Sequence, residues 1–289
     1  EMPFVIQVGD TLSALQDYAN HQRKRFDPKV VAVTGTNGKS TTKEMTAAVV
    51  ETRFRTLKTP GNFNNHIGLP LSILAADDSH EFGVWEMGMS MPGEIRQLAG
   101  IAVPDVAVVT NIGMAHIESM KSQEAIAEEK GMLAEAIDEG GIVILNGEDA
   151  YAESIAGRCR ARVVTVGFGA GEFRAVEVQQ SEQGMEFTIV ANGDSHRACV
   201  GASGRHMVVN ALMAAAVGSH LGLSMEVITR GLSRASLTSG RMQKKTIAGV
   251  AYIDDSYNAN PDSAKAAIDA LAGKQCKGRR ILVMGGMAE

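Results

Sequence analysis

The amino-acid sequence predicts an α/β fold: a mostly parallel sheet with a phosphate-binding loop, helices on both faces and a small antiparallel appendage, followed by the start of a second α/β (Rossmann-like) domain. Short apolar segments alternate with helix-like segments from residue 30 to residue 166, which is typical of strand–helix–strand units. Several of these segments, such as 105–110 (DVAVVT), are apolar without interruption, as strands buried on both faces are. A glycine-containing loop, TGTNGKSTT at 34–42, joins the first apolar segment to a helix.

The composition of the chain argues against nucleic-acid-binding and membrane-spanning proteins. The chain has 289 residues, 45% of them hydrophobic, and a net charge of −5 with acids and bases interspersed. We expect no nucleic-acid partner, because no basic surface is indicated, and no membrane span, because no apolar run approaches the ~20 residues that a bilayer requires. Cys159, Cys199 and Cys276 have no metal-binding spacing. We interpret them as small buried residues of a protein in a reducing, cytoplasmic compartment, and we expect a monomer.

The N-terminal segment has the character of a domain's tail joined to a linker helix. Residues 4–6 (FVI) look like the end of a strand. Asp10 is in position to cap a helix over 12–25, which ends before Pro28.

The loop TGTNGKSTT is the strongest functional signal. Gly35 and Gly38 allow a tight turn and the close approach of a ligand, and the amides that open the next helix can face a polyphosphate. Lys39 would reach the β- and γ-phosphates, and the Ser40 hydroxyl would bind Mg²⁺. The loop is G-x-x-G-K-S, because Val33 stands where the strict pattern has its first glycine. The alternative is a plain glycine turn with a surface lysine.

Polar side chains follow the next predicted strands. After a short strand at 54–57, residues 59–70 (TPGNFNNHIGLP) lead into a helix at 69–74. This segment can offer amide hydrogen bonds to a ligand or form an ordinary capped turn. Glu86 ends the alternating strand 81–87, where such folds place a metal or water ligand, although lone acids at strand ends are common.

His116 lies in the loop after the buried strand 105–110. It would share the carboxyl edge of the sheet with the phosphate-binding loop and Glu86, which leaves a ligand and a structural histidine as equal alternatives.

The remaining segments continue the alternation until residue 167. A helix is predicted over 122–137, with Ser122 as its cap and Lys130 inside it. From 167 to 200 the residues alternate without a helix signal, which indicates the antiparallel appendage. The other expected elements are a helix at 92–98, a strand at 142–145, a helix beginning within 146–149, a strand at 163–166, and helices at 204–221 and 225–232.

Residues 234–243 (RASLTSGRMQ) are the expected domain boundary. Beyond it we predict a strand at 245–253, a polar loop at 254–260, a helix at 261–271 with proline at its first position, and a strand at 280–284. Two strands and one helix cannot bury a core alone. We therefore expect the chain to be a fragment of a longer protein.

Taken in order, the motifs resemble those of the Mur ligases. They are TGTNGKSTTKE, GNFNNHIGLPLSIL, WEMGMSMPGEI, VVTNIGMAHIE, the lysine of AEEKGML, GRM and DDSYNANPDS. The details NFNNHIGLP, EMGMSMPGEI and YNANPDS are most similar to the MurF type, which joins D-alanyl-D-alanine to UDP-N-acetylmuramoyl-tripeptide. The resemblance divides the chain into 1–28 (tail of the N-terminal domain and linker helix), 29–236 (central ATP-binding domain) and 237–289 (beginning of the C-terminal ligase domain).

The resemblance implies an ATP-dependent, amide-bond-forming ligase of peptidoglycan synthesis, which acts through an acyl-phosphate with ATP and Mg²⁺ as cofactors. The implied catalytic residues are Lys39, His116 and Lys130. The implied metal ligands are Ser40, Glu86, His116 and Lys130, the last as a carbamate. The implied nucleotide ligands are Gly35, Thr36, Asn37, Gly38, Lys39, Ser40, Thr41, Asn210 (adenine), Arg241 (phosphates) and Asp254 (ribose), and Asn258 and Asn260 match the MurF-type loop.

Alternatives and departures remain at this point. Met207 stands where the family's H-N-x-x-N helix has its first asparagine, and Ser40 replaces the commoner threonine. From the residues alone, Lys130 would be a solvated helix lysine paired with a neighbouring glutamate. The competing functions are another Mur-type ligase that adds an amino acid or glutamate, an NTP-binding switch without ligation, and a degenerate binding module.

Overall fold

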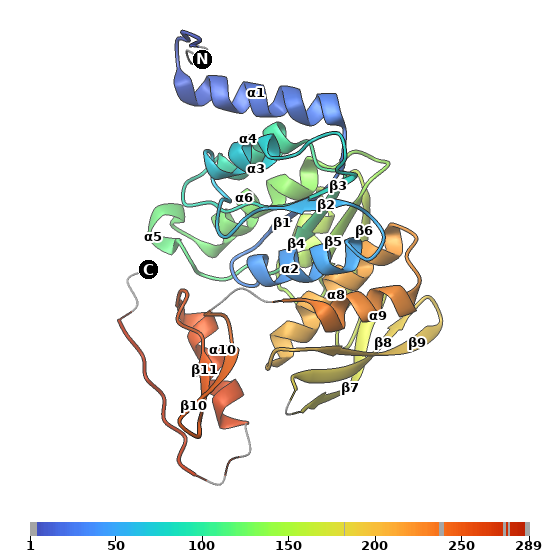
Figure 1. The fold of residues 1–289 in the computed structure, drawn as a ribbon, viewed down its shortest axis with the longest axis vertical. Helices are drawn as coiled ribbons and strands as arrows, with labels where there is room; N and C mark the ends of the chain where they lie inside the picture. The colour runs from blue at the N-terminus through green and yellow to red at the C-terminus, as the bar shows by residue number, and fades with distance from the viewer. Residues whose placement is uncertain (1–4, 182, 237–239, 274–275, 277, 287–289) are drawn as a thin grey trace.

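A nine-stranded sheet with helices on both faces forms the body of the chain (Figure 1). The computed structural model describes residues 5–181, 183–236, 240–273, 276 and 278–286. The strands of the sheet are β1 (Lys29–Thr34), β2 (Thr56–Lys58), β3 (Phe82–Glu86), β4 (Val106–Val109), β5 (Ile142–Asn146), β6 (Arg162–Gly167), β7 (Phe173–Gln180), β8 (Met185–Ala191) and β9 (Asp194–Val200). Their order is β2-β3-β1-β4-β5-β6-β7-β8-β9, parallel from β2 to β7 and antiparallel beyond. The predicted α/β class is confirmed.

Most of the helices cover one face or the other of this sheet. They are α1 (Thr11–Phe26), α2 (Lys39–Val50), α3 (Gly68–Leu74), α4 (Glu94–Ala102), α5 (Ile117–Met120), α6 (Gln123–Glu135), α7 (Ala152–Ala156), α8 (Arg205–His220), α9 (Met225–Arg234) and α10 (Pro261–Ala272). In Figure 1, α3, α4 and α6 lie on the side of α1, whereas α2, α8 and α9 lie on the opposite side. As predicted, Asp10 caps α1 and Ser122 caps α6. Among the described residues, no helix is both long and apolar enough to cross a membrane.

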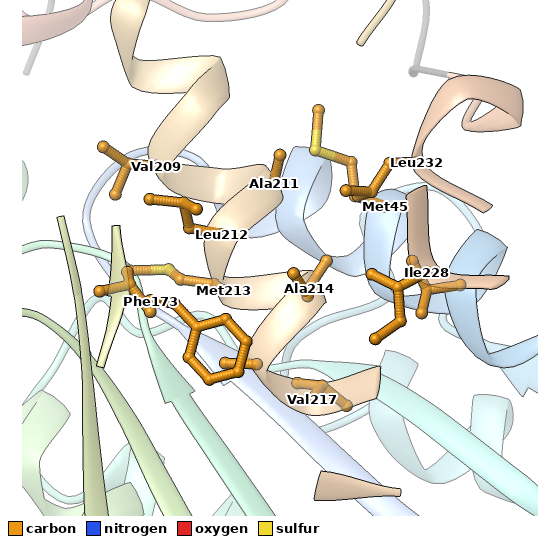
Figure 2. Packing of buried hydrophobic residues seen from close by; sticks show 14 of the residues in the cluster. Met45, Phe173, Val209, Ala211, Leu212, Met213, Ala214, Val217, Ile228 and Leu232 are labelled. Carbon is orange, nitrogen blue, oxygen red and sulfur yellow. The ribbon is translucent and has the colours of Figure 1, made fainter. Parts of the chain in front are cut away.

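Two apolar clusters, one on each face, hold these layers together. Alternate residues of β1 enter different clusters, with Val31 and Val33 in one and Val30 and Ala32 in the other. The larger cluster surrounds α8, and Figure 2 shows its alanine-rich face between Phe173 of β7 on one side and Met45, Ile228 and Leu232 of α2 and α9 on the other. Small side chains let these helices approach closely.

The antiparallel strands extend the main sheet. β7 joins β6 through only two residue pairs, Val166↔Phe173 and Gly167↔Arg174, so the predicted appendage is a continuation of the same sheet. β8 and β9 form a hairpin whose turn, Asn192-Gly193, has φ values of 54° and 86°. Positive φ at both turn residues matches the twist of the flanking strands.

Residues beyond 240 form a separate hairpin and helix. The single strand predicted at 245–253 is wrong: β10 (Gln243–Ile247) and β11 (Val250–Asp254) pair antiparallel around Ala248-Gly249, where φ is 49° and 76°. The predicted helix at 261–271 is confirmed as α10. It begins with Pro261 after a capping box between Asn260 and Ser263.

Four other expectations differ from the structure. The cysteines are not buried as expected, because Cys159 is half-buried and Cys199 and Cys276 are exposed. Val5 and Ile6 are in no strand and are strongly exposed, while Phe4 lies outside the described residues. The helix expected within 146–149 begins later, at Ala152. Residues 280–284 have no regular structure, because no described strand lies beside them to pair with.

Candidate functional site

The carboxyl ends of three neighbouring strands bring the predicted site residues to one edge of the sheet. β1 lies between β3 and β4. The phosphate-binding loop follows β1, Glu86 ends β3, and His116 follows β4. The chain crosses from β3 past β1 to β4 at this point, and such a switch in strand order leaves a crevice at the carboxyl edge.

The phosphate-binding loop needs glycine at two positions. Gly35 has a φ of 144°, and a Cβ there would lie 1.9 Å from Thr110 Oγ1. Gly38, the N-cap of α2, has a φ of 82°, and its Cβ would lie 2.8 Å from Asn210 Oδ1. The loop is also tied to the strand-end segment beside it, since Asn111 Oδ1 accepts a hydrogen bond from the Asn37 amide at 2.8 Å. These contacts fix the loop backbone before any ligand arrives.

One carbonyl of this loop accepts hydrogen bonds from two lysines. Lys39 Nζ donates to Gly35 O at 2.8 Å and to Thr36 O at 2.9 Å. Lys130 Nζ, from α6, donates to Gly35 O at 3.1 Å. The structure therefore brings together two residues that are 91 positions apart, as 130 − 39 gives.

Lys130 is buried, with 2% of its surface exposed. The solvated lysine expected from helical position alone is therefore wrong. Its neighbour Glu129 attracts it only through its charge, because the Glu129 carboxylate accepts hydrogen bonds from the amides of Gly93 and Ile95 at the start of α4. Burial, reinforced by the positive charge of Lys39, holds the pKa of Lys130 well below its ordinary value.

Glu86 is a buried carboxylate with one free oxygen. Its Oε1 accepts a hydrogen bond from Asn64 Nδ2 at 2.8 Å, and its backbone amide donates to Thr59 Oγ1 at 2.9 Å. Its Oε2 is buried and has no hydrogen-bond partner among the described residues. A buried carboxylate oxygen that accepts no hydrogen bond is costly, and the nearest cation, Lys43 Nζ, lies 3.8 Å away, so this atom can still bind a metal cation.

The donor set as a whole suits Mg²⁺. Ser40 supplies a hydroxyl from the first turn of α2 and is buried, while His116 lines the cavity above Lys39. No group of three or more His, Cys, Asp or Glu placed to hold a metal is found among the described residues. Mg²⁺ commonly takes one or two protein carboxylates and completes its shell with water and substrate phosphates, so a sparse set does not argue against it.

Two cavities lie between the sheet edge and the second unit. The first, of about 110 Å³, is lined by Thr36, Asn37, Gly38, Lys39, Ala115, His116, Gly240, Arg241, Asp255, Tyr257, Asn258, Asn260 and Ser263. The second, of about 220 Å³, is lined by Asn37, Gly38, Thr41, Thr110, Asn111, Asn146, His206, Met207, Val209, Asn210, Arg241, Met242, Asp255, Asp262, Ser263 and Ala266. The first cavity borders the phosphate-binding loop. The second cavity is lined by both apolar side chains and amides, which suits the binding of a planar base.

The second unit contacts the loop directly. Asn37 and Asn260 exchange amide hydrogen bonds of 2.7 Å and 3.3 Å. Arg241, predicted to reach phosphates, lines both cavities and lies with its guanidinium 4.2 Å from the centre of the Tyr257 ring. That stacking orients the planar cation.

Asp254 is placed differently from the expectation. Its carboxylate accepts hydrogen bonds from Lys245 Nζ and Ser256, and it lines neither cavity. Those hydrogen bonds lower the pKa of Asp254 to about 2. Asp255, one residue on, lines both cavities and accepts a hydrogen bond from the Met242 amide at 3.0 Å. The polar residues DDSYNAN predict that this loop contributes to the site. Which of the two aspartates faces the cavities depends on where β11 ends, and this is seen only in the structure.

His206 was also not predicted as a site residue. It lines the second cavity, and burial lowers the pKa of its imidazole, although Asp255 acts in the opposite direction. It is therefore neutral at neutral pH. The signal in the sequence is the position of His206 directly before Met207, the residue that departs from the family's H-N-x-x-N pattern.

Comparison with known proteins agrees with this arrangement. A family model described as "Mur ligase middle domain" matches residues 33–218, and one described as "Mur ligase, glutamate ligase domain" matches residues 240–289. The UDP-N-acetylmuramoyl-tripeptide--D-alanyl-D-alanine ligase of Bacillus subtilis (strain 168) is 42% identical over 287 residues, which cover 99% of this chain and 62% of that protein. The protein of the same name from Escherichia coli (strain K12) is 34% identical, with 100% of this chain and 64% of that protein covered.

Solved structures give the same result. A crystal structure of MurF from Acinetobacter baumannii matches with a TM-score of 0.89 at 32% identity, over 95% of this chain and 62% of that one. A MurF ligase from Thermotoga maritima in complex with ADP matches with a TM-score of 0.86 at 29% identity, over 94% of this chain and 64% of that one. This chain thus spans slightly less than two thirds of the length of these relatives. Because the middle-domain model matches more than half of the residues of this chain, the chain belongs to the Mur ligase family.

Proposed function

We propose that the chain carries the ATP-binding core of a ligase that joins D-alanyl-D-alanine to UDP-N-acetylmuramoyl-tripeptide in peptidoglycan precursor synthesis. The observation that carries this proposal is the meeting of Lys39 and Lys130 on the Gly35 carbonyl, beside a buried carboxylate with a free oxygen. Relatives named for this reaction match nearly the whole chain. We also propose that the protein is cytoplasmic, and that residues 29–236 form the central domain and residues 237–289 the beginning of the C-terminal domain.

The residues divide the work of phosphoryl transfer. The loop amides and Lys39 hold and neutralise the γ-phosphate of ATP, so that a substrate carboxylate oxygen can attack its phosphorus, with ADP as the leaving group, to form an acyl-phosphate. The amine of D-alanyl-D-alanine then attacks the acyl carbon, and phosphate leaves. Ser40, Glu86, His116 and a carbamylated Lys130 would hold Mg²⁺, which supplies charge stabilisation at the phosphate oxygens. A lysine with a strongly lowered pKa has the free amine that adds CO₂.

The nucleotide would span both cavities. Asn210 and the apolar side chains near it suit the adenine, and Arg241, oriented by Tyr257, suits the phosphates. For the ribose contact we propose Asp255 in place of Asp254, because Asp255 lines both cavities.

Phosphate release by the open reading frame that contains this chain tests the function. A ligase releases phosphate from ATP only when both the tripeptide nucleotide and D-alanyl-D-alanine are present. Steady release without either substrate would favour an NTP-binding switch, and activity with a single amino acid or glutamate in place of the dipeptide would favour another Mur-type ligase.

A further inference from the structure

A second lysine of α2, Lys43, is completely buried and has no role in the proposed reaction. Its side chain is 0% exposed, one helical turn beyond Lys39. Lysine is rarely buried unless it is paired, because removing an ammonium from water is costly. Its surroundings therefore need an explanation.

The three donors of the Lys43 ammonium are all used. Nζ lies 2.9 Å from Thr59 O, 3.2 Å from Gly61 O and 3.1 Å from Glu44 Oε1. An ammonium has three N–H groups and no acceptor. These contacts tie α2 to the first residues of the amide-rich segment 59–67.

The Glu86 carboxylate is the fourth neighbour of Lys43. Glu86 Oε2 lies 3.8 Å from Nζ, too far for a hydrogen bond but close enough for strong attraction in a buried place. The ammonium therefore attracts this oxygen without donating to it, and Oε2 keeps its lone pairs free. Asn64, in the same segment, holds the other oxygen at 2.8 Å.

The charges of the cluster balance. Glu44 is shared, with Oε1 facing Lys43 and Oε2 facing Lys58 at 2.6 Å. Two lysines and two glutamates, Glu44 and Glu86, leave no net charge. Lys58 is 37% exposed and has no recorded contact with Glu86, so it offers a matched control for Lys43.

We propose that Lys43 is a positioning residue, which holds the Glu86 carboxylate and the backbone of 59–61 in one arrangement so that Glu86 Oε2 is ready to bind a divalent cation. The inference rests on the proposed function insofar as that cation accompanies ATP. Groups that orient a metal ligand from behind commonly change metal affinity when they are removed.

The test compares Lys43→Met with Lys58→Met in the purified 289-residue chain. Binding of Mg²⁺ at fixed ATP is followed by isothermal titration calorimetry, with the fluorescence of Trp85, the only tryptophan of the chain and the residue before Glu86, as a second probe. We expect Lys43→Met to raise the Mg²⁺ concentration for half-maximal change roughly 10- to 100-fold, the usual effect of losing such a supporting group. Lys58→Met should leave it within about twofold, because Lys58 is partly exposed and its ion pair is with Glu44, not with Glu86. An unchanged Mg²⁺ requirement in a folded Lys43→Met chain overturns the proposal.

A second measurement separates this inference from the proposed function. Hydrogen exchange of the amides in 59–68 without ligand should accelerate in Lys43→Met and not in Lys58→Met, and equal rates overturn the proposal. A wild-type chain that shows no Mg²⁺-dependent ATP binding contradicts the proposed function, while hydrogen exchange still decides whether Lys43 holds the segment. Should Lys43→Met fail to fold, Lys43→Gln keeps a donor for Thr59 O and loses the charge, and the same shift in Mg²⁺ requirement is expected.

Discussion

At the scale of single residues, Lys39 lines the cavity beside the phosphate-binding loop, where we propose that the transferred phosphate binds. We expect Lys39→Ala to reduce ATP-dependent amide formation on the order of 10³-fold or more, because it removes the charge that stabilises the transition state. Gly35 O keeps its hydrogen bond from Lys130, so the thermal unfolding midpoint should change little. Near-normal turnover by a folded mutant would contradict the assignment.

Lys130 illustrates a conflict between stability and function. Burying its amine is unfavourable, and Gly35 O retains Lys39 as a donor if Lys130 is lost. We therefore expect Lys130→Met to raise the free energy of unfolding at pH 7 by about 1–2 kcal/mol, as replacements of strained site residues can, while ligation is abolished. Urea unfolding measures the first effect.

The proposed carbamate at Lys130 can be tested by chemical rescue. Lys130→Ala in the complete reading frame should lose activity and recover part of it when a small carboxylic acid fills the vacated space. A fully active alanine variant would show that Lys130 is no metal ligand.

His206 should make stability depend on pH. Its pKa in the folded chain is lowered below the ordinary 6.5 by burial, so below pH 6.5 the unfolded chain binds a proton that the folded chain does not. Stability is then lost as pH falls from 6.5 towards the folded pKa. His206→Gln should flatten the pH dependence of urea unfolding between pH 7.5 and 5. The pKa of His220 is lowered in the same direction, so His220→Gln measures how much of the pH dependence comes from that second histidine. If His206→Gln leaves the wild-type slope unchanged, His206 is not its source.

At the scale of elements, the strand-to-helix turn at Gly35 tolerates no side chain. A Cβ would meet Thr110 Oγ1 at 1.9 Å with φ at 144°. We expect Gly35→Ala to destabilise the chain by about 2–4 kcal/mol through strain and collision and to abolish nucleotide binding. Gly140→Ala is the matched control, since a Cβ there has nothing within 4 Å and φ is outside the left-handed range. Equal melting temperatures for the two variants would show that the loop can rearrange.

Elements with strong local signals could be predicted from the sequence. Periodicity, caps and the glycine-lysine-serine loop located most strands and helices near the site, and the carboxyl-edge rule brought Glu86 and His116 to the loop. The hairpin at 243–254 could not be predicted, because its Ala248-Gly249 turn lacks the usual asparagine or aspartate signal. Residues 280–284 have strand-like composition, but pairing depends on a neighbour that the described chain does not contain.

Burial of charged groups was the other part that sequence could not predict. A lysine within an amphipathic helix is expected at the surface. Lys43 and Lys130 are nevertheless buried, because carbonyl oxygens of loops elsewhere in the chain accept hydrogen bonds from their Nζ atoms. Asp254 and Asp255 differ by one position, and only the end of β11 decides which carboxylate faces the cavities.

At the scale of the whole molecule, the Asn37–Asn260 pair connects the sheet edge to the second unit. We expect Asn37→Ala to widen the distribution of shapes seen by small-angle X-ray scattering without nucleotide, because both amide hydrogen bonds are lost. Asn258→Ala is the control, because the recorded hydrogen bond of its side chain is local, from the Ala259 amide to Asn258 Oδ1. Identical scattering from wild type and Asn37→Ala would show that other contacts hold the units together.

The turn of the β8–β9 hairpin, beyond the two-pair junction of β6 with β7, is a suitable place to attach a tag to the protein. The hairpin of β8 and β9 lies at the far end of the sheet order from β1, and its Asn192-Gly193 turn is exposed. Exposed hairpin turns accept inserted sequence more readily than other positions. An affinity tag inserted at this turn would lie away from the candidate site, which suits it to immobilisation. A cysteine introduced there for a fluorophore would be labelled selectively only after the exposed Cys199 and Cys276 are replaced.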